Sequence, residues 1–118
     1  MAKNDSKVNP LIITLENGDT YTLEFSRETV KFAEDRKFNI SELTDFPQTN
    51  IPALWFYAFR KNHKEMARSQ TDRILFEELG GLTKDEIERL VQLYNQPTES
   101  LIILEDGGRK NAKVTVQL

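Results

Sequence analysis

The fold of this chain is decided by the stretch Ala53-Leu54-Trp55-Phe56-Tyr57-Ala58-Phe59, which is apolar on every side of a helix. A fully apolar helical surface must meet either the protein core or another protein. The stretch lies in a chain of 118 residues that has a net charge of −3, no cysteine and a single histidine. It is therefore interpreted as the central helix of a small domain and as the first candidate for a binding surface.

The aromatic stretch can have one of two roles. The favoured one is a core helix wrapped by a hairpin and by other helices. In the other, one side of the helix stays partly open as a groove for a partner segment, since aromatic residues and arginine are enriched at the centres of interfaces. The residues that we nominate for partner binding are Trp55, Phe56, Tyr57, Phe59, Arg60 and Lys64.

The aromatic helix is predicted to begin at a cap formed by Thr49 or Asn50, with Pro52 tolerated in its first turn. It is predicted to continue in polar form to Arg68, which would align Arg60, Lys64 and Arg68 at i, i+4 and i+8. Such a row could contact an acidic partner or a phosphate. More often it is a solvated face that pairs with nearby carboxylates.

Residues Leu11 to Phe25 are predicted to form a β-hairpin around Asn17-Gly18. A two-residue loop would place Glu16 opposite Asp19, two like charges. A three-residue loop, Glu16-Asn17-Gly18 with Gly18 left-handed, instead collects the apolar side chains on one face. That face consists of Leu11, Ile13, Leu15, Tyr21, Leu23 and Phe25. The opposite face consists of Thr14, Thr20, Thr22 and Glu24, with Ile12 as its apolar exception.

Two helices are predicted between the hairpin and the aromatic stretch. Ser26 caps the first, which should run to about Arg36 or Lys37, with a hydrophobic staple between Phe25 and Val30. Asn39, followed by Glu42 three residues later, predicts a second, short helix that Pro47 ends. The side chains that this short helix should turn inward are Ile40, Leu43 and Phe46.

Two further helices are predicted after the aromatic stretch. The first starts at Ser69 or Thr71 and ends at Gly80 in a left-handed cap. The second begins with a capping box of Thr83 and Glu86 and is closed by Pro97. It carries the cleanest helical stripe in the chain, with apolar side chains at i, i+3, i+4 and i+7: Ile87, Leu90, Val91 and Tyr94.

The C-terminal segment has a different pattern. Leu101 to Leu104 is a short β-like run, Glu105 to Asn111 is polar, and Val114 to Leu118 alternates apolar and polar residues. This pattern predicts a short second hairpin, with a flexible tail as the alternative.

Together these elements predict an α+β fold, in which an N-terminal β-hairpin packs on a cluster of about four to five helices and C-terminal strands could extend it. The expected organisation is a polar N-terminal arm over 1–10, one α+β domain over 11–97 and a C-terminal segment over 98–118. The longest apolar run falls far short of the ~20 residues that a membrane helix needs. Since the first nine residues also lack a signal-peptide core, we expect a cytoplasmic protein with no membrane partner.

The residues carry no pattern typical of catalysis, so we expect no enzyme activity, no cofactor and no bound metal. His63 has no partner spaced for catalysis and is interpreted as a surface histidine whose replacement should leave folding and binding almost intact. Gly80-Gly81 lacks the lysine and hydroxyl of a phosphate loop. Adjacent acidic pairs such as Glu77-Glu78 point about 100° apart on a helix and do not converge on a metal. The mixed charge argues against non-specific nucleic-acid binding.

Several short motifs of the chain nevertheless resemble phage tail assembly chaperones. They are Phe46-Pro47, Ile51-Pro52, Trp55-Phe56-Tyr57-Ala58-Phe59-Arg60, His63-Lys64, Thr71-Asp72, Leu75-Phe76-Glu77 and Leu79-Gly80-Gly81-Leu82. The hairpin and capped helix over Leu11 to Arg36 also resemble the N-terminal half of that family. The resemblance covers most of Leu11 to Tyr94, although the family has no catalytic signature that could be checked.

The resemblance implies a non-enzymatic protein of a long-tailed phage or prophage. Such proteins act in the host cytoplasm, bind tail tube subunits or the tape measure protein before polymerisation, and are absent from the finished virion. In many relatives a programmed frameshift adds a C-terminal extension. Two alternatives from other classes stay open. One is a structural virion component such as a connector or tail-completion protein. The other is a small regulator that binds nucleic acid through Arg60, Lys64, Arg68 and Arg73.

Overall fold

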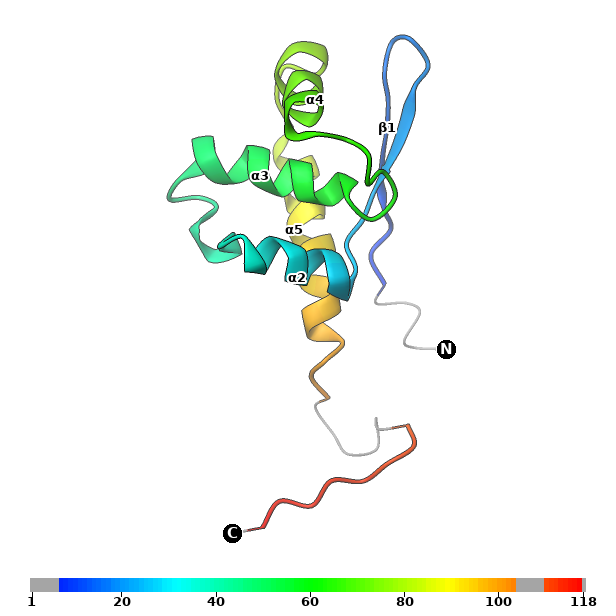
Figure 1. The fold of residues 1–118 in the computed structure, drawn as a ribbon, viewed down its shortest axis with the longest axis vertical. Coiled ribbons are helices and arrows are strands. Elements are labelled where there is room, and N and C mark those ends of the chain that lie inside the picture. The colour runs from blue at the N-terminus through cyan, green and yellow to red at the C-terminus, as the bar shows by residue number, and fades with distance from the viewer. Residues whose placement is uncertain (1–6, 104–109, 118) are drawn as a thin grey trace.

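The structure, a computed structural model, describes residues 7–103 and 110–117 and has the predicted α+β architecture. A hairpin of β1 (Leu11–Thr14) and β2 (Thr20–Leu23) is followed by the helices α2 (Arg27–Asp35), α3 (Pro47–Phe59), α4 (Arg68–Arg73) and α5 (Lys84–Glu99). A 3₁₀ turn, η1 (Ile40–Glu42), precedes α3, and a π-helical turn, η2 (Ile74–Glu78), continues α4. In Figure 1, α2 and α3 cross in front of the long α5, and the hairpin stands beside them.

The hairpin has the predicted register. β1 and β2 are antiparallel with Leu11 opposite Leu23 and Ile13 opposite Tyr21. The Leu15 N–H donates to the Asp19 carbonyl at 2.8 Å, and Gly18 is left-handed with φ 98°, so the loop contains three residues. The predicted inner face is buried or packs against the core, whereas Ile12 is 60% exposed on the other face. The separation of the two faces therefore follows from the alternation in the sequence.

The core is built around α3, which confirms the favoured interpretation of the aromatic stretch. Trp55 is fully buried, and its indole N–H donates to the Thr71 carbonyl at 2.8 Å, which ties α3 to α4. The Trp55 and Phe59 rings meet edge to face with centroids 5.1 Å apart. On the far side of the core, Tyr94 of α5 makes edge contacts with Phe25 and Phe38. Burial, together with the nearby Glu34 carboxylate, raises the pKa of Tyr94 to about 12.

The start of α3 differs from the prediction. The helix begins at Pro47 instead of following a cap at Thr49 or Asn50, because the fixed φ of proline suits the first helical position. Asn50 is buried, and its side-chain amide donates to the Glu42 carbonyl at 3.0 Å, which holds η1 against α3. The prediction for Phe46 was also wrong: η1 ends at Glu42, the helical spacing does not reach Phe46, and this side chain is 59% exposed.

The end of α3 also differs from the prediction, because the helix stops at Phe59 and residues 60–67 form an irregular connection to α4. Arg60, Lys64 and Arg68 therefore do not form a row on one helix. This connection closes the outer edge of β2: the Asn62 amide donates to the Thr22 carbonyl at 3.1 Å, and the Thr22 N–H donates to Nε2 of His63 at 3.0 Å. The two side chains thus take the place of a neighbouring strand and protect the edge.

His63 is therefore not the dispensable surface residue that the sequence suggested. Its ring is partly buried and meets the Tyr21 ring edge to face at 5.1 Å, in addition to accepting the Thr22 N–H. We expect His63→Ala to lower the free energy of unfolding by about 1–3 kcal/mol, because the Thr22 N–H loses its acceptor. Urea denaturation followed by circular dichroism measures this change. The neighbouring exposed Lys64 is the control, since Lys64→Ala should change stability by no more than about 0.5 kcal/mol. Equal effects of the two variants would refute the edge-closing role.

The segment after α3 begins and ends close to the predicted positions, but part of it is wound differently. α4 begins at Arg68, and the π-helical turn η2 then places the Leu79 N–H 2.9 Å from the Ile74 carbonyl, five residues earlier. Gly80 is left-handed with φ 69°, as predicted for a helix cap. Thr83 and Glu86 form the predicted capping box: the Glu86 N–H donates to Oγ1 of Thr83 at 3.1 Å and the Thr83 N–H donates to Oε1 of Glu86 at 2.8 Å.

The C-terminal part departs from the expected strands. α5 runs through Pro97 to Glu99, so Pro97 does not close it. Among the described residues, Leu101–Ile103 and 110–117 form no strand, and the predicted second hairpin is not formed by them. Leu104, the connection 105–109 and Leu118 lie outside the described residues. Short strands need a hydrophobic face to pack on, and Leu101, Ile102, Ile103, Val114 and Val116 are all exposed.

Candidate partner-binding site

The structure separates the residues nominated for partner binding into a buried and an accessible group. Trp55, Tyr57 and Phe59 are buried, with 0%, 7% and 1% of their surface exposed, so they hold the core together and do not reach a partner. Phe56 and Arg60 are partly exposed, and Lys64 is exposed. The aromatic helix therefore offers at most one aromatic side chain for contact, and the expectation that its aromatic face forms an interface centre holds only for Phe56.

The accessible members of this group do not converge on one contact surface. The Arg60 guanidinium lies over the Phe32 ring of α2 at 3.8 Å from the ring centroid, where it is held by a cation–π contact. The Phe56 ring has the Arg68 guanidinium 5.9 Å from its centroid, and Arg68 is paired with Asp72 at 3.1 Å. Since Arg60 and Arg68 have partners on different elements, the basic row on which the nucleic-acid alternative depended is absent from the described part of the chain.

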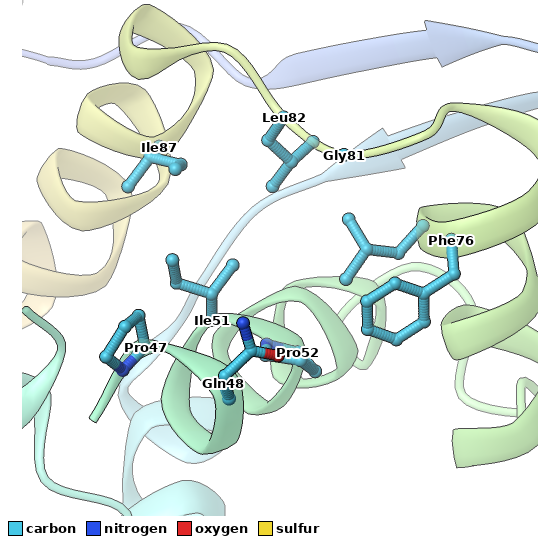
Figure 2. A pocket seen from close by; sticks show the side chains of 9 residues that line it. Pro47, Gln48, Ile51, Pro52, Phe76, Gly81, Leu82 and Ile87 are labelled. Atoms are coloured by element: carbon cyan, nitrogen blue, oxygen red, sulfur yellow. The ribbon is translucent and has the colours of Figure 1, made fainter.

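A different surface combines apolar exposure with concave shape. It is a hollow of about 190 Å³ between the start of α3, the turn η2 and the start of α5 (Figure 2). The residues that line it are Pro47, Gln48, Ile51, Pro52, Leu75, Phe76, Gly81, Leu82 and Ile87. Figure 2 shows Phe76 and Ile87 at opposite ends of the hollow, with Ile51 and Pro52 of α3 between them. Gln48 is its single polar side chain, so the hollow suits an apolar group.

A second, larger hollow of about 610 Å³ adjoins the first along α5. It is lined by Leu43, Thr44, Lys84, Ile87, Glu88, Val91 and Gln92. Because Ile87 lines both hollows, they lie next to each other on the surface, and we call the two together the α3–α5 groove. Its combined size lies within the range of natural binding pockets, about 300–1,000 Å³. A third hollow, of about 430 Å³ beside the C-terminal end of α5, has four charged residues among the eight that line it: Arg27, Lys31, Glu34 and Asp35.

The local geometry of η2 explains why an aromatic ring lies exposed at the rim of the groove. Ile74 and Leu75 are consecutive and both buried, so this side of the turn packs against the core. The following residue, Phe76, then points outward and is 56% exposed, and Leu79 is 38% exposed. π-Helical turns are rare and occur frequently at functional sites. A large exposed aromatic side chain beside an apolar hollow is typical of a protein-binding surface.

The groove could not be predicted from the sequence because its lining comes from three separate stretches of the chain. The signal that could have found it was Phe76, an apolar residue whose neighbours one helical turn earlier, Asp72 and Arg73, are charged. Leu82 and Ile87, on either side of the Thr83 cap, both line the smaller hollow.

The carboxyl group of Glu24, beside β2, has a shifted pKa. Hydrogen bonding from the Asn62 amide is the main reason why the pKa of Glu24 is lowered, with the Lys61 ammonium, 3.3 Å away, adding to the effect. These contacts belong to the closed edge of β2 and lie away from the groove residues. Within 7–103 and 110–117, no three acidic or histidine side chains gather as a metal site, and no helix combines the length and apolarity needed to span a bilayer.

Comparison with known proteins gives one match. No curated protein and no solved structure matches the chain. A family model described as a domain of unknown function (DUF5055) matches residues 1–118, and the chain therefore belongs to that family.

Proposed function

We propose that this protein is a non-enzymatic tail assembly chaperone of a long-tailed phage or prophage, which binds tail tube or tape measure protein in the host cytoplasm before polymerisation. The proposal combines two features of the chain: the sequence motifs that resemble tail assembly chaperones and the α3–α5 groove. Unassembled tail proteins expose apolar seams and strand edges, which aggregate unless they are covered. A small domain with an open apolar groove could cover such a seam reversibly.

One observation carries the proposal. Seven of the nine residues that line the smaller hollow belong to the motifs through which the sequence resembles tail assembly chaperones. They are Pro47, Ile51, Pro52, Leu75, Phe76, Gly81 and Leu82. These seven residues are spread over 36 positions of the chain, from Pro47 to Leu82, and the fold gathers them around one hollow. Pro52 and Leu75 are buried, whereas the other five stay exposed or partly exposed at the surface.

Co-expression tests the proposed function. The protein is produced together with the tape measure or tail tube protein encoded in the same genome, and the partner is followed in the soluble fraction. We expect the partner to become more soluble and to co-purify with the protein. If neither partner co-purifies and the protein is found instead in mature particles in fixed stoichiometry, the chaperone proposal fails and a structural virion component takes its place.

A pair of variants then locates the contact surface. Phe76→Ala removes an exposed ring at the groove, and we expect it to weaken the complex by about 2 kcal/mol or more if the ring is a hot spot. Phe56→Ala removes the accessible ring of the aromatic helix and is the matched control. Pull-down with purified partner compares them. A complex that survives Phe76→Ala but not Phe56→Ala would move the interface to the aromatic helix.

A further inference from the structure

We infer that the α3–α5 groove takes one amphipathic helix of the partner, with an apolar stripe for the groove and basic side chains beside that stripe. This inference rests on the proposed function for the identity of the partner and deepens it by naming the kind of segment that is bound. Of the two proposed clients, it favours the tape measure protein, a long helical chain, over the tube subunit with its strand edges.

The walls of the groove favour a helix over an extended strand. They are formed by residues of α3, η2, α5 and the connections before α3 and α5, and no residue of β1 or β2 is among them, so the groove offers no strand edge for pairing. An extended segment would bury its N–H and carbonyl groups against these walls without partners, which costs free energy. A helix satisfies its backbone internally and presents only side chains to the groove. The occupant is therefore a helix.

The shape of the groove fits side chains at helical spacing. Its two hollows meet at Ile87, and the exposed Phe76 ring stands at the far end of the smaller one. Side chains three or four residues apart on a helix lie about 5–6 Å from each other. Successive apolar side chains of one helix can thus enter the two adjoining hollows, with a further one against Phe76.

The segments that form the groove are acidic, which favours basic side chains on the bound helix. The segments from which its lining comes, residues 42–52 and 74–92, carry seven acidic side chains and two basic ones, a net charge of −5 in a chain whose total is −3. Of these charged residues, Glu88 and Lys84 line the groove itself, and the others belong to the surrounding segments. The acidic residues are Glu42, Asp45, Glu77, Glu78, Asp85, Glu86 and Glu88. Arg73, just outside these segments, pairs with Glu78 at 3.1 Å and reduces their net negative charge by one. A helix with lysine or arginine beside its apolar stripe complements this surface, whereas an acidic helix is repelled.

Two synthetic peptides test the inference on the full chain. Both are about 20 residues long, or about 30 Å as helices, with leucine at i, i+3, i+4 and i+7. One carries lysine on its polar face and the other glutamate. Binding is measured by fluorescence anisotropy of the labelled peptides. We expect the lysine peptide to bind at least about tenfold more tightly at low salt, since several exposed ion pairs together reach that ratio, and we expect the ratio to fall as salt is added.

Variants decide whether this binding occurs in the groove. Phe76→Ala should weaken the lysine peptide at least about tenfold, whereas Ile12→Ala, which removes an equally exposed apolar side chain from the hairpin, should not. Glu88→Lys at the groove should reduce the preference for the lysine peptide over the glutamate peptide, whereas Glu28→Lys on α2 should not. Equal affinity for the two peptides, or loss of binding in the hairpin and α2 controls alone, overturns the inference. Such a result leaves the proposed function standing if the tail protein still co-purifies.

Discussion

Trp55→Ala is expected to lower the free energy of unfolding by about 3–5 kcal/mol, the range found for large aromatic side chains removed from a core. Trp55 is fully buried at the centre of α3, and its removal leaves a cavity between α3 and α4. It also leaves the Thr71 carbonyl without the indole N–H that it accepts at 2.8 Å. Urea denaturation followed by circular dichroism measures the change, since the variant removes the single tryptophan of the chain and with it the intrinsic fluorescence probe.

Two further variants separate the causes of this loss. Trp55→Phe keeps most of the apolar volume but removes the hydrogen bond, so it should cost less than Trp55→Ala. Phe56→Ala deletes the neighbouring aromatic ring, which is partly exposed, and should also cost less. If Phe56→Ala destabilised the protein as much as Trp55→Ala, the assignment of Trp55 to the interior and Phe56 to the surface would be wrong.

Local signals in the sequence were enough for the hairpin and for the start of α5. The register of β1 and β2 follows from the repulsion that a two-residue loop would create between Glu16 and Asp19, together with the alternation of apolar side chains. The capping box of Thr83 and Glu86 is equally local, because its two partners are three residues apart. Such features depend on a few neighbouring residues, which is why they could be predicted.

The end of α3 could not be predicted in this way. Residues 60–67 contain arginine, lysine, glutamate, methionine and alanine, which favour helices, and neither glycine nor proline. The helix nevertheless stops at Phe59, where Asn62 and His63 bond to Thr22, about 40 positions earlier in the chain. A tertiary contact thus overrides local propensity. The same holds for the α3–α5 groove, whose lining residues are brought together only by the fold.

Because most of the aromatic stretch is buried, its middle part cannot be the contact surface that the sequence suggested. The sequence could not show which apolar side chains stay accessible, because Trp55 and Phe76 look alike as large aromatic residues on helical segments. In the structure the first is fully buried and the second is 56% exposed at an apolar hollow. The expected contact surface therefore shifts from the middle of α3 to its start, together with η2 and α5.

Leu90→Ala is expected to lower the free energy of unfolding by about 2–5 kcal/mol, because it deletes a side chain that is 1% exposed from the inner face of α5. Thr83→Ala, which removes the cap of the same helix, should cost only about 0.5–2 kcal/mol. Urea denaturation ranks the two variants. The reverse order would mean that α5 contributes through its first turn more than through its packing.

Replacing the next residue along α5 separates effects on stability from effects on peptide binding. Val91 is partly exposed and lines the larger hollow, so Val91→Ala should cost less stability than Leu90→Ala but should weaken binding of the lysine peptide. Leu90→Ala, measured where it is still folded, should leave peptide affinity unchanged, because its side chain faces the core and not the groove. Anisotropy titrations of both variants make the comparison. Equal loss of affinity in the two would show that the groove depends on the core packing beneath it, and that the outer face of α5 is not by itself the contact surface.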